Sequence, residues 1–392
     1  MGKATKIAIY TGLVPSATFI ERLIKGLANK GLHIYLFGVQ KGKPTSLENV
    51  FYFTYTKKFS KLIHLIKYSL LLSLFKMKEK RKLDNIIASK NKNSRQLKIK
   101  YYPVLYHRPD IFHLQWAKGI KDWLWVQEFG IKLIVSLLGT HLTISPIGDE
   151  YWKGTYSKYF AKVDGFQAVS KSMIPITERF GVQLKKIKVV KSGLDMNKLP
   201  FTKKIEISKP LKIVSIGRSH WVKGFSYALD AMNILDKENI DFSYTIVGVD
   251  KNEELLYKRL QFGLENKITF KATLPFTEVL TLIRNADVLL LSSVEEGIAN
   301  VVLEAMALGT IVVTTDCGGM SEVVTDTENG FIVPKRNSEA IASALKNISK
   351  LSIESYKNIT KAARTTIESQ HNHENMIVEM KDLYHTVLKD QL

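Results

Sequence analysis

The stretch VLLLSSVEEGIANVVLEAMALG, residues 288–309, places a short apolar strand, a loop and a helix in direct succession. Val288 to Leu291 predicts a buried strand, and the run from about Asn300 predicts a helix. The first N–H groups of a helix have no partner inside it, and the helix dipole places partial positive charge beside them. The backbone N–H groups of residues 297–300 therefore predict an anion site at the carboxyl end of this strand.

Two glutamates flank this predicted site. Glu296 lies in the loop and Glu304 lies one turn into the helix, so both carboxylates can face one bound molecule. Carboxylates accept hydrogen bonds from hydroxyls, and we expect one glutamate to bind a sugar and the other a ribose. The alternatives are that Glu296 caps the helix and that Glu304 is a solvated surface residue. The apolar residues around Glu304 favour the binding role.

Short apolar strands alternate with helices along the rest of the chain, which predicts parallel sheets covered on both faces. A loop at residues 12–15 opens a helix over 16–30, and Pro200 and Pro210 mark a linker over 195–210. The last helices are expected at 338–348 and 373–389. The expected strands are residues 6–10, 33–37, 110–114, 132–138 and 165–169 before the linker, and 211–216, 244–247, 268–271, 288–291, 311–314 and 331–333 after it.

This pattern predicts an α/β protein with two Rossmann-like, doubly wound domains. We expect a basic, acceptor-binding domain over residues 1–198 and a donor-binding domain over 199–372. A terminal helix over 373–392 is expected to pack toward the first domain. Ligands of open parallel sheets bind outside the carboxyl ends of the strands, so the domains are expected to face each other across a shared cleft.

Composition excludes several protein classes. With 392 residues, 45% of them hydrophobic, the chain is neither disordered nor fibrous. Cys317 is the only cysteine, so the chain has no intrachain disulfide. Residues 1–10 lack the features of a signal peptide, and no run of eighteen apolar residues occurs. We expect a cytoplasmic protein, peripheral at the inner face of the plasma membrane.

The net charge of +20 is concentrated in the first half of the chain. Residues 57–100 alone carry 14 basic and 2 acidic side chains, around the apolar residues 68–75. Such a segment seeks an anionic partner, and we rank a membrane surface first, a phosphate-bearing acceptor second and nucleic acid third. Because no nucleic-acid-binding signature occurs, we expect no nucleic-acid partner. The alternative is a buried helix over 61–75 with lysines solvated at its ends.

A second informative segment is SIGRSHWVKG, residues 215–224, directly after an expected strand. Gly217 permits a tight turn, and it places Arg218 and Lys223 at the carboxyl end of the sheet. Two cations beside a helix N-terminus suit a diphosphate, whose charge grows as it leaves a sugar.

Together these segments resemble family 4 of the retaining glycosyltransferases, which have the GT-B fold. The resemblance rests on the Glu296-to-Glu304 spacing followed by AMAxG, and on Gly217-Arg218 with Lys223. It is strongest over residues 211–334 and weakest over 51–101. It also includes NADVLLLSS at 285–293, GGMSEVV at 318–324 and SGLD at 192–195.

The resemblance implies transfer of a sugar from a nucleotide diphosphate sugar with retention at the anomeric carbon. Arg218 and Lys223 would neutralise the diphosphate, Glu304 would bind the ribose and Glu296 the transferred sugar. The loop at 273–275 would lie against the base, and Gly12 with residues 16–20 would approach the diphosphate from the first domain. The expected donor-binding residues are Gly12, Gly217, Arg218, Lys223, Leu274, Glu296, Gly297, Ile298, Ala299, Asn300, Val301 and Glu304, and the expected catalytic residues are His141, Arg218, Lys223 and Glu296.

One departure from the family concerns its His-Gly-x-Asp motif, where this chain has Leu138-Gly-Thr-His141. Either His141 takes the place of the missing histidine or it is an ordinary loop residue. Asp195 and His113 are weaker candidates for a general base. No Asp-x-Asp triplet occurs and the histidines are scattered, so we expect neither a metal nor a cofactor.

The expected partners are therefore a nucleotide-sugar donor and a glycan or lipid-linked acceptor, besides the anionic membrane surface at residues 57–100. Two alternatives share the fold: a nucleotide-sugar epimerase, which needs no acceptor, and a sugar-nucleotide-binding protein without catalysis. A dinucleotide-dependent oxidoreductase is disfavoured because Gly-x-Gly-x-x-Gly follows none of the first strands.

Overall fold

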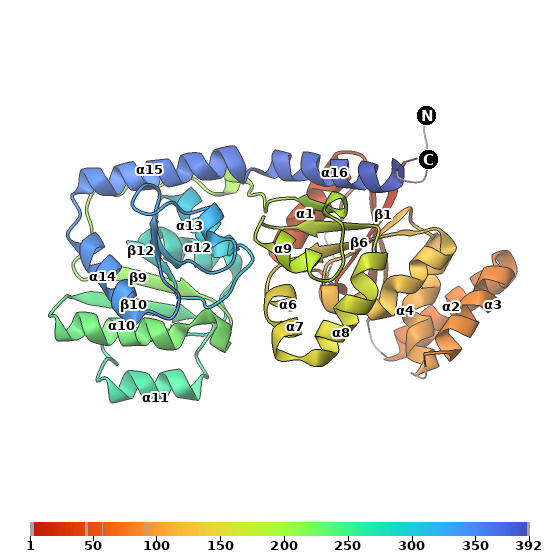
Figure 1. Ribbon diagram of the computed structural model, residues 1–392, viewed down its shortest axis with the longest axis horizontal. Helices are drawn as coiled ribbons and strands as arrows, with labels where there is room; N and C mark the ends of the chain where they lie inside the picture. The colour runs from red at the N-terminus through yellow and green to blue at the C-terminus, as the bar shows by residue number, and fades with distance from the viewer. Residues whose placement is uncertain (1–3, 44–45, 57, 91–92, 390–392) are drawn as a thin grey trace. The chain divides into compact units, whose positions relative to one another are not determined.

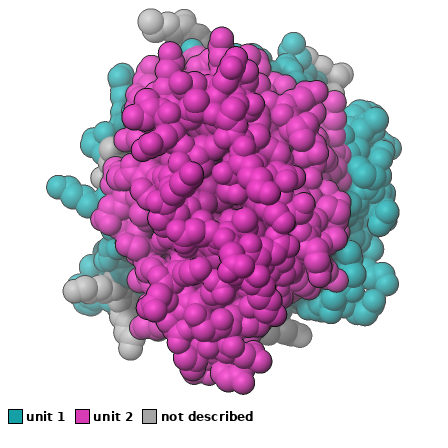
Figure 2. Space-filling view, turned by 90° about the vertical axis from the view of Figure 1, so that its left-hand side faces the viewer, with its two compact units in different colours: residues 1–169, 174–190, 376–392 teal, residues 170–173, 191–375 magenta. Residues whose placement is uncertain are grey.

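The computed structural model describes residues 4–43, 46–56, 58–90 and 93–389. They form two compact units, drawn in two colours in Figure 2. The first unit holds the chain up to Val169, Ile174–Val190 and the segment from Met376, and the second holds Ser170–Met173 and Lys191–Asn375. The structure does not describe residues 1–3, 44–45, 57, 91–92 and 390–392. Parts of the expected basic segment 57–100, of the expected first domain and of the expected terminal helix 373–392 therefore lie outside the described residues.

The sheet of the first unit is parallel in all its pairings, with the order β2-β3-β1-β5-β6-β7-β8 and β4 paired to β3. All five strands expected before the linker are present, and β2, β4 and β8 are additional. The strands are β1 (Lys6–Tyr10), β2 (Gly12–Val14), β3 (His33–Gln40), β4 (Val50–Tyr55), β5 (Ile111–Leu114), β6 (Lys132–Leu137), β7 (Gly165–Ala168) and β8 (Ile187–Val189).

The prediction of a loop at residues 12–15 is wrong for residues 12–14, which form strand β2. Gly12 pairs with Gly38 of β3 in parallel register. A Cβ atom on Gly38 would lie 2.6 Å from the Gly12 carbonyl oxygen, so only a glycine permits this approach. The signal for β2 was therefore a glycine more than twenty residues away, in another strand.

Alternate residues of the first sheet face two different cores. Ile9 and Ile111 pack with helix α1 and the C-terminal helix α16 in one apolar cluster. On the other face, Phe112 stacks on Trp123 with ring centroids 4.3 Å apart. The longer helices of this unit are α1 (Thr18–Asn29), α2 (Lys58–Phe75), α3 (Met77–Ala88), α4 (Ser94–His107), α8 (Glu150–Tyr159) and α16 (His373–Lys389), and the shorter ones are α5 (Ile120–Trp123), α6 (Thr140–Thr143), α7 (Ser145–Gly148) and α9 (Met173–Glu178).

The second unit contains a six-stranded parallel sheet with the order β11-β10-β9-β12-β13-β14. All six strands expected after the linker are present. They are β9 (Leu211–Ile216), β10 (Phe242–Val247), β11 (Ile268–Lys271), β12 (Val288–Leu291), β13 (Ile311–Thr315) and β14 (Phe331–Val333).

Helices cover both faces of this second sheet, as the doubly wound pattern predicts. Leu290 belongs to the core cluster that includes α10 and α14, whereas its neighbour Leu289 belongs to the cluster that includes α12, α13 and α15. Helix α15 was not expected from the sequence. The helices are α10 (Phe225–Lys237), α11 (Glu253–Gln261), α12 (Phe276–Asn285), α13 (Asn300–Leu308), α14 (Ser338–Ser349) and α15 (Ile353–Gln370).

The segment expected as a linker, residues 195–210, is firmly attached to the second unit. Asp287 is completely buried and accepts hydrogen bonds from the backbone N–H groups of Ser208, at 3.3 Å, and Lys212, at 2.8 Å. Its carboxylate also forms an ion pair with Lys204. A buried carboxylate is stable only when it is paired and hydrogen-bonded, so Asp287 fixes this segment at the edge of the sheet.

The helix expected over residues 61–75 is present within α2, but the interpretation that it is buried is wrong. Ile63, Ile66 and Leu70 are each at least half exposed, although His64 and Tyr68 of the same helix are buried. Among the described residues, no helix combines the length and apolar character needed to cross a membrane.

Candidate active site

Numbered from β9 as strand 1, the strands of the second sheet lie in the order 3-2-1-4-5-6. Successive strands are therefore added in one direction from β9 and in the opposite direction from β12. Loops leaving two such neighbouring strands diverge to opposite faces and leave a crevice at their carboxyl ends. The segment that starts at Gly217 follows β9, and the segment that starts at Ser292 follows β12. The two segments singled out in the sequence therefore meet at this switch point.

The loop after β9 is locked against the loop after β12. Gly224 adopts a φ of +61°, and a Cβ atom there would lie 2.0 Å from the carbonyl oxygen of Ser292. The Ser292 hydroxyl donates to the Lys223 carbonyl oxygen at 2.9 Å, and the Val294 N–H donates to the Val222 carbonyl oxygen at 2.7 Å. Because these bonds hold the backbone on both sides of Lys223, its side chain starts from a fixed point.

Lys223 and Glu296 form an ion pair across the two loops. The Lys223 Nζ lies 2.5 Å from Glu296 Oε1, and the Ser293 hydroxyl donates to the same oxygen at 2.8 Å. The side chains are 20% and 14% exposed, so the pair is largely shielded from water but reachable. A cation and a carboxylate in this setting can bind an anionic group and a hydroxyl group of one ligand.

Glu296 does not cap helix α13, so that alternative is wrong. The N-cap residue of α13 is Ala299, and no side chain caps the helix there. The positive end of the helix dipole at Asn300 is therefore not neutralised by a capping side chain. Ile298 and Ala299 have buried side chains in the core, so only their backbones can face a ligand.

Glu304 lies in the same helix and is 6% exposed, which rules out the solvated-surface alternative. The apolar cluster that includes the buried residues of α13 also contacts three partly buried side chains. These are Leu274, which follows β11; Ile216, which ends β9; and Val301, which follows Asn300. Leu274, the expected contact for the base, thus packs on the same apolar cluster as the buried neighbours of Glu304 in α13.

A third loop, after β13, supports the loop that carries Glu296, and no such role was expected from the sequence. Gly318 adopts a φ of +55°, and a Cβ atom there would lie 1.7 Å from the carbonyl oxygen of Glu296. The Gly319 N–H donates to the Gly297 carbonyl oxygen at 2.9 Å, and the Thr315 hydroxyl donates to the Ser293 carbonyl oxygen at 2.5 Å. The glycine pair at 318–319 was the available signal for this contact.

Cys317, in this third loop, is buried beside the site. Burial, together with the nearby carboxylates of Glu296 and Glu295, raises the pKa of its thiol to about 12. A thiol is nucleophilic only as the thiolate, so Cys317 is an inert core residue.

Arg218 is exposed and directly follows Gly217. The Gly217 N–H donates to the Val247 carbonyl oxygen at 3.1 Å, which fixes the start of this loop at the end of β10. A Cβ atom on Gly217 would lie 3.3 Å from side-chain atoms of Lys223, so this glycine leaves room for the lysine. No contact joins Arg218 to Glu296 or Glu304 among the described interactions.

The candidates in the first unit lie at the carboxyl edge of their own sheet. Gly12 follows β1, and His141 lies in the short helix α6 after β6. The rings of His141 and Trp116 are 5.1 Å apart, and Trp116 follows β5. The Tyr156 hydroxyl donates to the His141 carbonyl oxygen at 2.9 Å, which fixes the backbone at this position.

Of the two weaker candidates for a general base, His113 is a structural residue. His113 is fully buried between Ser136 and Tyr384, each 2.8 Å from one ring nitrogen, and burial lowers its pKa to about 3. Asp195 forms an ion pair with Lys198 at 3.3 Å. In the described part of the chain, no group of three or more His, Cys, Asp or Glu side chains is arranged to hold a metal ion.

Comparison with known proteins agrees with this geometry. Residues 198–366 match the family model "Glycosyl transferases group 1". The putative colanic acid biosynthesis glycosyltransferase WcaL of Escherichia coli is 29% identical over 235 residues, which is 58% of this chain and 58% of WcaL. The amylovoran biosynthesis glycosyltransferase AmsK of Erwinia amylovora is 27% identical over 248 residues, 62% of this chain and 60% of AmsK. The matches thus span little more than half the length of these relatives.

Solved structures share the fold over nearly the whole chain. Sucrose-phosphate synthase from Thermosynechococcus elongatus has a TM-score of 0.74 at 17% identity and covers 98% of this chain and 100% of its own. Anabaena Alr3699/HepE in complex with UDP-glucose has a TM-score of 0.72 at 16% identity and covers 97% of this chain and 99% of its own. The expected fold class, with two Rossmann-like parallel-sheet domains as in GT-B glycosyltransferases, is confirmed. The loops of the switch point lie inside the region, residues 198–366, that matches the model of the group 1 glycosyl transferases.

Proposed function

We propose that this chain is a retaining glycosyltransferase of family 4. It transfers a sugar from a UDP- or GDP-sugar to a glycan or polyprenyl-linked acceptor in the synthesis of a cell-surface polysaccharide. Support comes from the family match over residues 198–366 and from relatives named for colanic acid and amylovoran biosynthesis.

The observation that carries this proposal is the Lys223–Glu296 ion pair at the switch point of the second sheet. In the transfer, the bond between the anomeric carbon and the diphosphate oxygen breaks, and its electron pair leaves with the diphosphate. A hydroxyl of the acceptor forms the new bond to the anomeric carbon, and its proton passes to the departing diphosphate. Lys223 and Arg218 stabilise the charge that develops on the leaving group, and the carboxylate of Glu296 orients the sugar.

We propose that the reaction needs no metal, because protein groups supply the positive charge. These groups are Lys223, Arg218 and the uncapped N-terminus of α13. Turnover should therefore be unchanged in EDTA, and loss of turnover that added Mg²⁺ restores would contradict this part of the proposal.

The proposed setting is the cytoplasm, at the inner face of the plasma membrane, with residues 57–100 on the anionic lipid surface. The 14 basic and 2 acidic side chains of that segment support it. A lipid-linked acceptor would be met at the same surface.

A panel of nucleotide sugars, tested by thermal shift and then by product analysis, decides the function. A donor that binds only the folded protein raises its unfolding temperature. Donor consumption that depends on an added acceptor supports a transferase, and acceptor-independent conversion of the sugar indicates an epimerase. Binding without turnover, against the panel and a polyprenyl-phosphate-linked acceptor, would indicate a binding protein.

A further inference from the structure

Helix α2 is anchored to the first unit by one face only. His64, Tyr68 and Leu72 follow each other at intervals of four residues and are all buried. The Tyr68 hydroxyl lies 3.0 Å from Nε2 of His107 in α4, and the rings of Tyr68 and His64 are 4.8 Å apart. Residues spaced by four lie on one face of a helix, so the opposite face of α2 is turned away from this packing.

That opposite face is apolar, and we call its five large side chains the α2 ridge. Their spacings of four, three, four and four residues place them in one stripe along the helix. Each of these side chains is between 50% and 74% exposed, and a continuous apolar stripe of this kind marks an interaction surface. The α2 ridge consists of Phe59, Ile63, Ile66, Leu70 and Leu74.

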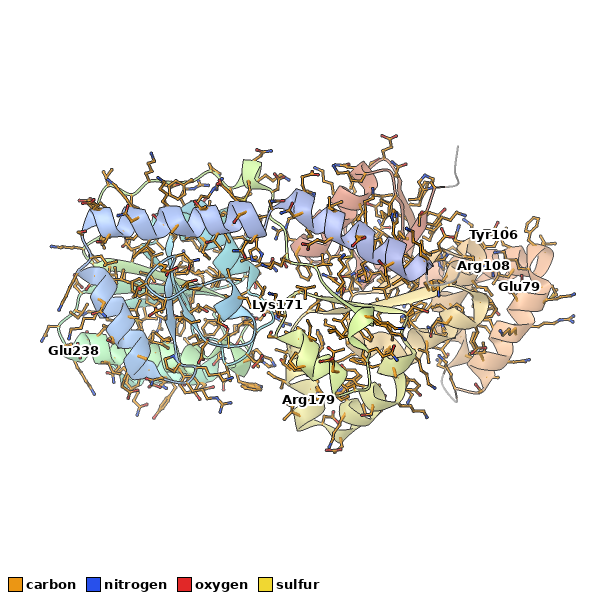
Figure 3. The ribbon with its side chains drawn as sticks, turned by 45° about the horizontal axis from the view of Figure 1, so that its top comes forward. Glu79, Tyr106, Arg108, Lys171, Arg179 and Glu238 are labelled. Carbon is orange, nitrogen blue, oxygen red and sulfur yellow. The ribbon has the colours of Figure 1, made fainter. Side chains whose placement is uncertain are left out.

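Exposed cations lie on α2 and on the neighbouring helix α3. Lys61 and Lys67 on α2 and Lys78 and Arg81 on α3 are exposed. Acidic side chains do not balance these cations. Residues 57–100 contain two acids, and one of them, Asp84, pairs with Lys98 at 3.1 Å. The other is Glu79 on α3, which Figure 3 labels. Helices α2 and α3 lie together on one side of the first unit (Figure 1), so the ridge and the cations share one region of the surface.

A cavity of about 480 Å³ lies beside the N-terminal half of α2, at the carboxyl ends of β3 and β4. Its lining mixes cations with apolar groups, which is the chemistry that fits a phosphate attached to a hydrocarbon chain. The lining includes Lys61, Leu62, Arg95, Ile99 and Lys100.

We propose that the α2 ridge inserts into the interfacial layer of an anionic phospholipid bilayer, with the exposed cations of α2 and α3 bound to lipid phosphates. Interfacial helices combine an apolar stripe with flanking lysines and arginines in this way. A second copy of the chain would bring the same excess of positive charge and would be repelled. Nucleic acid would match the charge but not the ridge.

This inference deepens the membrane association within the proposed function. Vesicle binding is measured without donor or acceptor, so it can fail while the transferase activity stands, and the reverse also holds.

The first experiment is co-sedimentation with vesicles of phosphatidylcholine, alone or with about a third phosphatidylglycerol. The unmodified protein should bind the anionic vesicles at least about tenfold more tightly, and added salt should weaken binding. The double variant Ile63→Ser/Leu70→Ser should lose on the order of tenfold or more in affinity, because two inserted side chains are removed. The matched control is Leu184→Ser/Leu260→Ser, which removes two leucines that are 57% and 62% exposed outside α2 and should bind normally.

The second experiment reports on insertion directly. Cys317 is buried, so in a Leu70→Cys variant an environment-sensitive fluorophore reacts with the introduced thiol. Its emission should shift to the blue on addition of anionic vesicles, whereas a probe on Leu260→Cys should not respond. Equal unfolding midpoints will show that the variants are folded.

Three results would overturn the proposal. They are unmodified protein that ignores anionic vesicles, a ridge double variant that binds as well as the control, and a dimer that the ridge double variant converts to a monomer. The last result would assign the ridge to a second copy of the chain.

Discussion

The Lys223–Glu296 ion pair joins two loops that leave neighbouring strands of one sheet. Replacing Lys223 with alanine should lower kcat/KM by about 100-fold or more, because a cation aimed at the leaving diphosphate is lost. The matched control is Lys258→Ala, which breaks the 2.7 Å ion pair with Asp230 in the same unit and should leave kcat/KM unchanged. Steady-state kinetics with the identified donor measure both, and equal activity of the two variants would refute the role of Lys223.

Gly318 is the residue on which the position of the Glu296 loop depends. A Gly318→Ala variant places a Cβ atom 1.7 Å from the Glu296 carbonyl oxygen, so the loop must move and donor affinity should fall. The control is Gly263→Ala, which has a similar φ of +67° but no atom within 4 Å of the new methyl group. Both variants carry the strain of a positive φ, about 1 kcal/mol. Urea unfolding should show a larger loss for Gly318→Ala, and only this variant should bind the donor more weakly.

At the scale of elements, helix α16 is joined to the first sheet by a buried polar network. Ser136 donates its hydroxyl hydrogen to Gln167 at 2.5 Å, so Nε2 of His113 donates to Ser136 and Nδ1 accepts from Tyr384 of α16. This assigns the neutral tautomer of His113, in agreement with the lowered pKa that burial causes.

A Tyr384→Phe variant tests this junction. It leaves a buried ring nitrogen without its donor, which should cost about 1–3 kcal/mol in the free energy of unfolding of the first unit. Val378→Ala on the same helix removes a side chain that is 61% exposed and should cost little. Urea unfolding followed by tryptophan fluorescence measures both, and equal stability of the two variants would show that the network contributes nothing.

At the scale of the whole molecule, the two units should differ in their sensitivity to acid. Burial lowers the pKa of His64 and His107 to about 4 and that of His113 to about 3, and all three lie in the first unit. In the second unit, burial lowers the pKa of His371 to about 4. Below the ordinary value of 6.5 the unfolded chain takes up protons that the folded chain refuses, so stability falls as pH falls from about 6.5 toward 4.

The first unit should therefore unfold at higher pH than the second. Each histidine contributes up to about 1.4 kcal/mol per pH unit within this window, and no contribution is expected above it. Fluorescence reports mainly on the first unit, which holds four of the five tryptophans: Trp116, Trp123, Trp125 and Trp152. Its urea midpoint should drop between pH 7 and pH 5 and stay constant between pH 7 and pH 8, and the reverse order of unfolding of the units would contradict this account.

Most of the fold could be predicted from local sequence pattern. Most of the eleven expected strands are short runs of mainly apolar residues, such as the fully buried Val288–Leu291, and their signal is contained in the run itself. Strand β4 (Val50–Tyr55) was not predicted, although its aromatic and β-branched residues favour a strand; it lies at the edge of the sheet, where only Val50 and Tyr55 are buried. Helix α15 escaped because its buried face includes the polar Thr360 and the small Ala363, which weaken the apolar period.

Local sequence was enough to predict the two doubly wound units and the loop and helix that bear Glu296 and Glu304, because strand runs, glycine positions and helix starts are local properties of the chain. Tertiary structure alone decided that Lys223 bonds to Glu296, that Gly318 supports the Glu296 loop and that the α2 ridge faces solvent. The two contacts of the Glu296 loop join residues far apart in sequence, and the exposure of the ridge depends on which side of α2 remains uncovered after packing. No run of neighbouring residues encodes either.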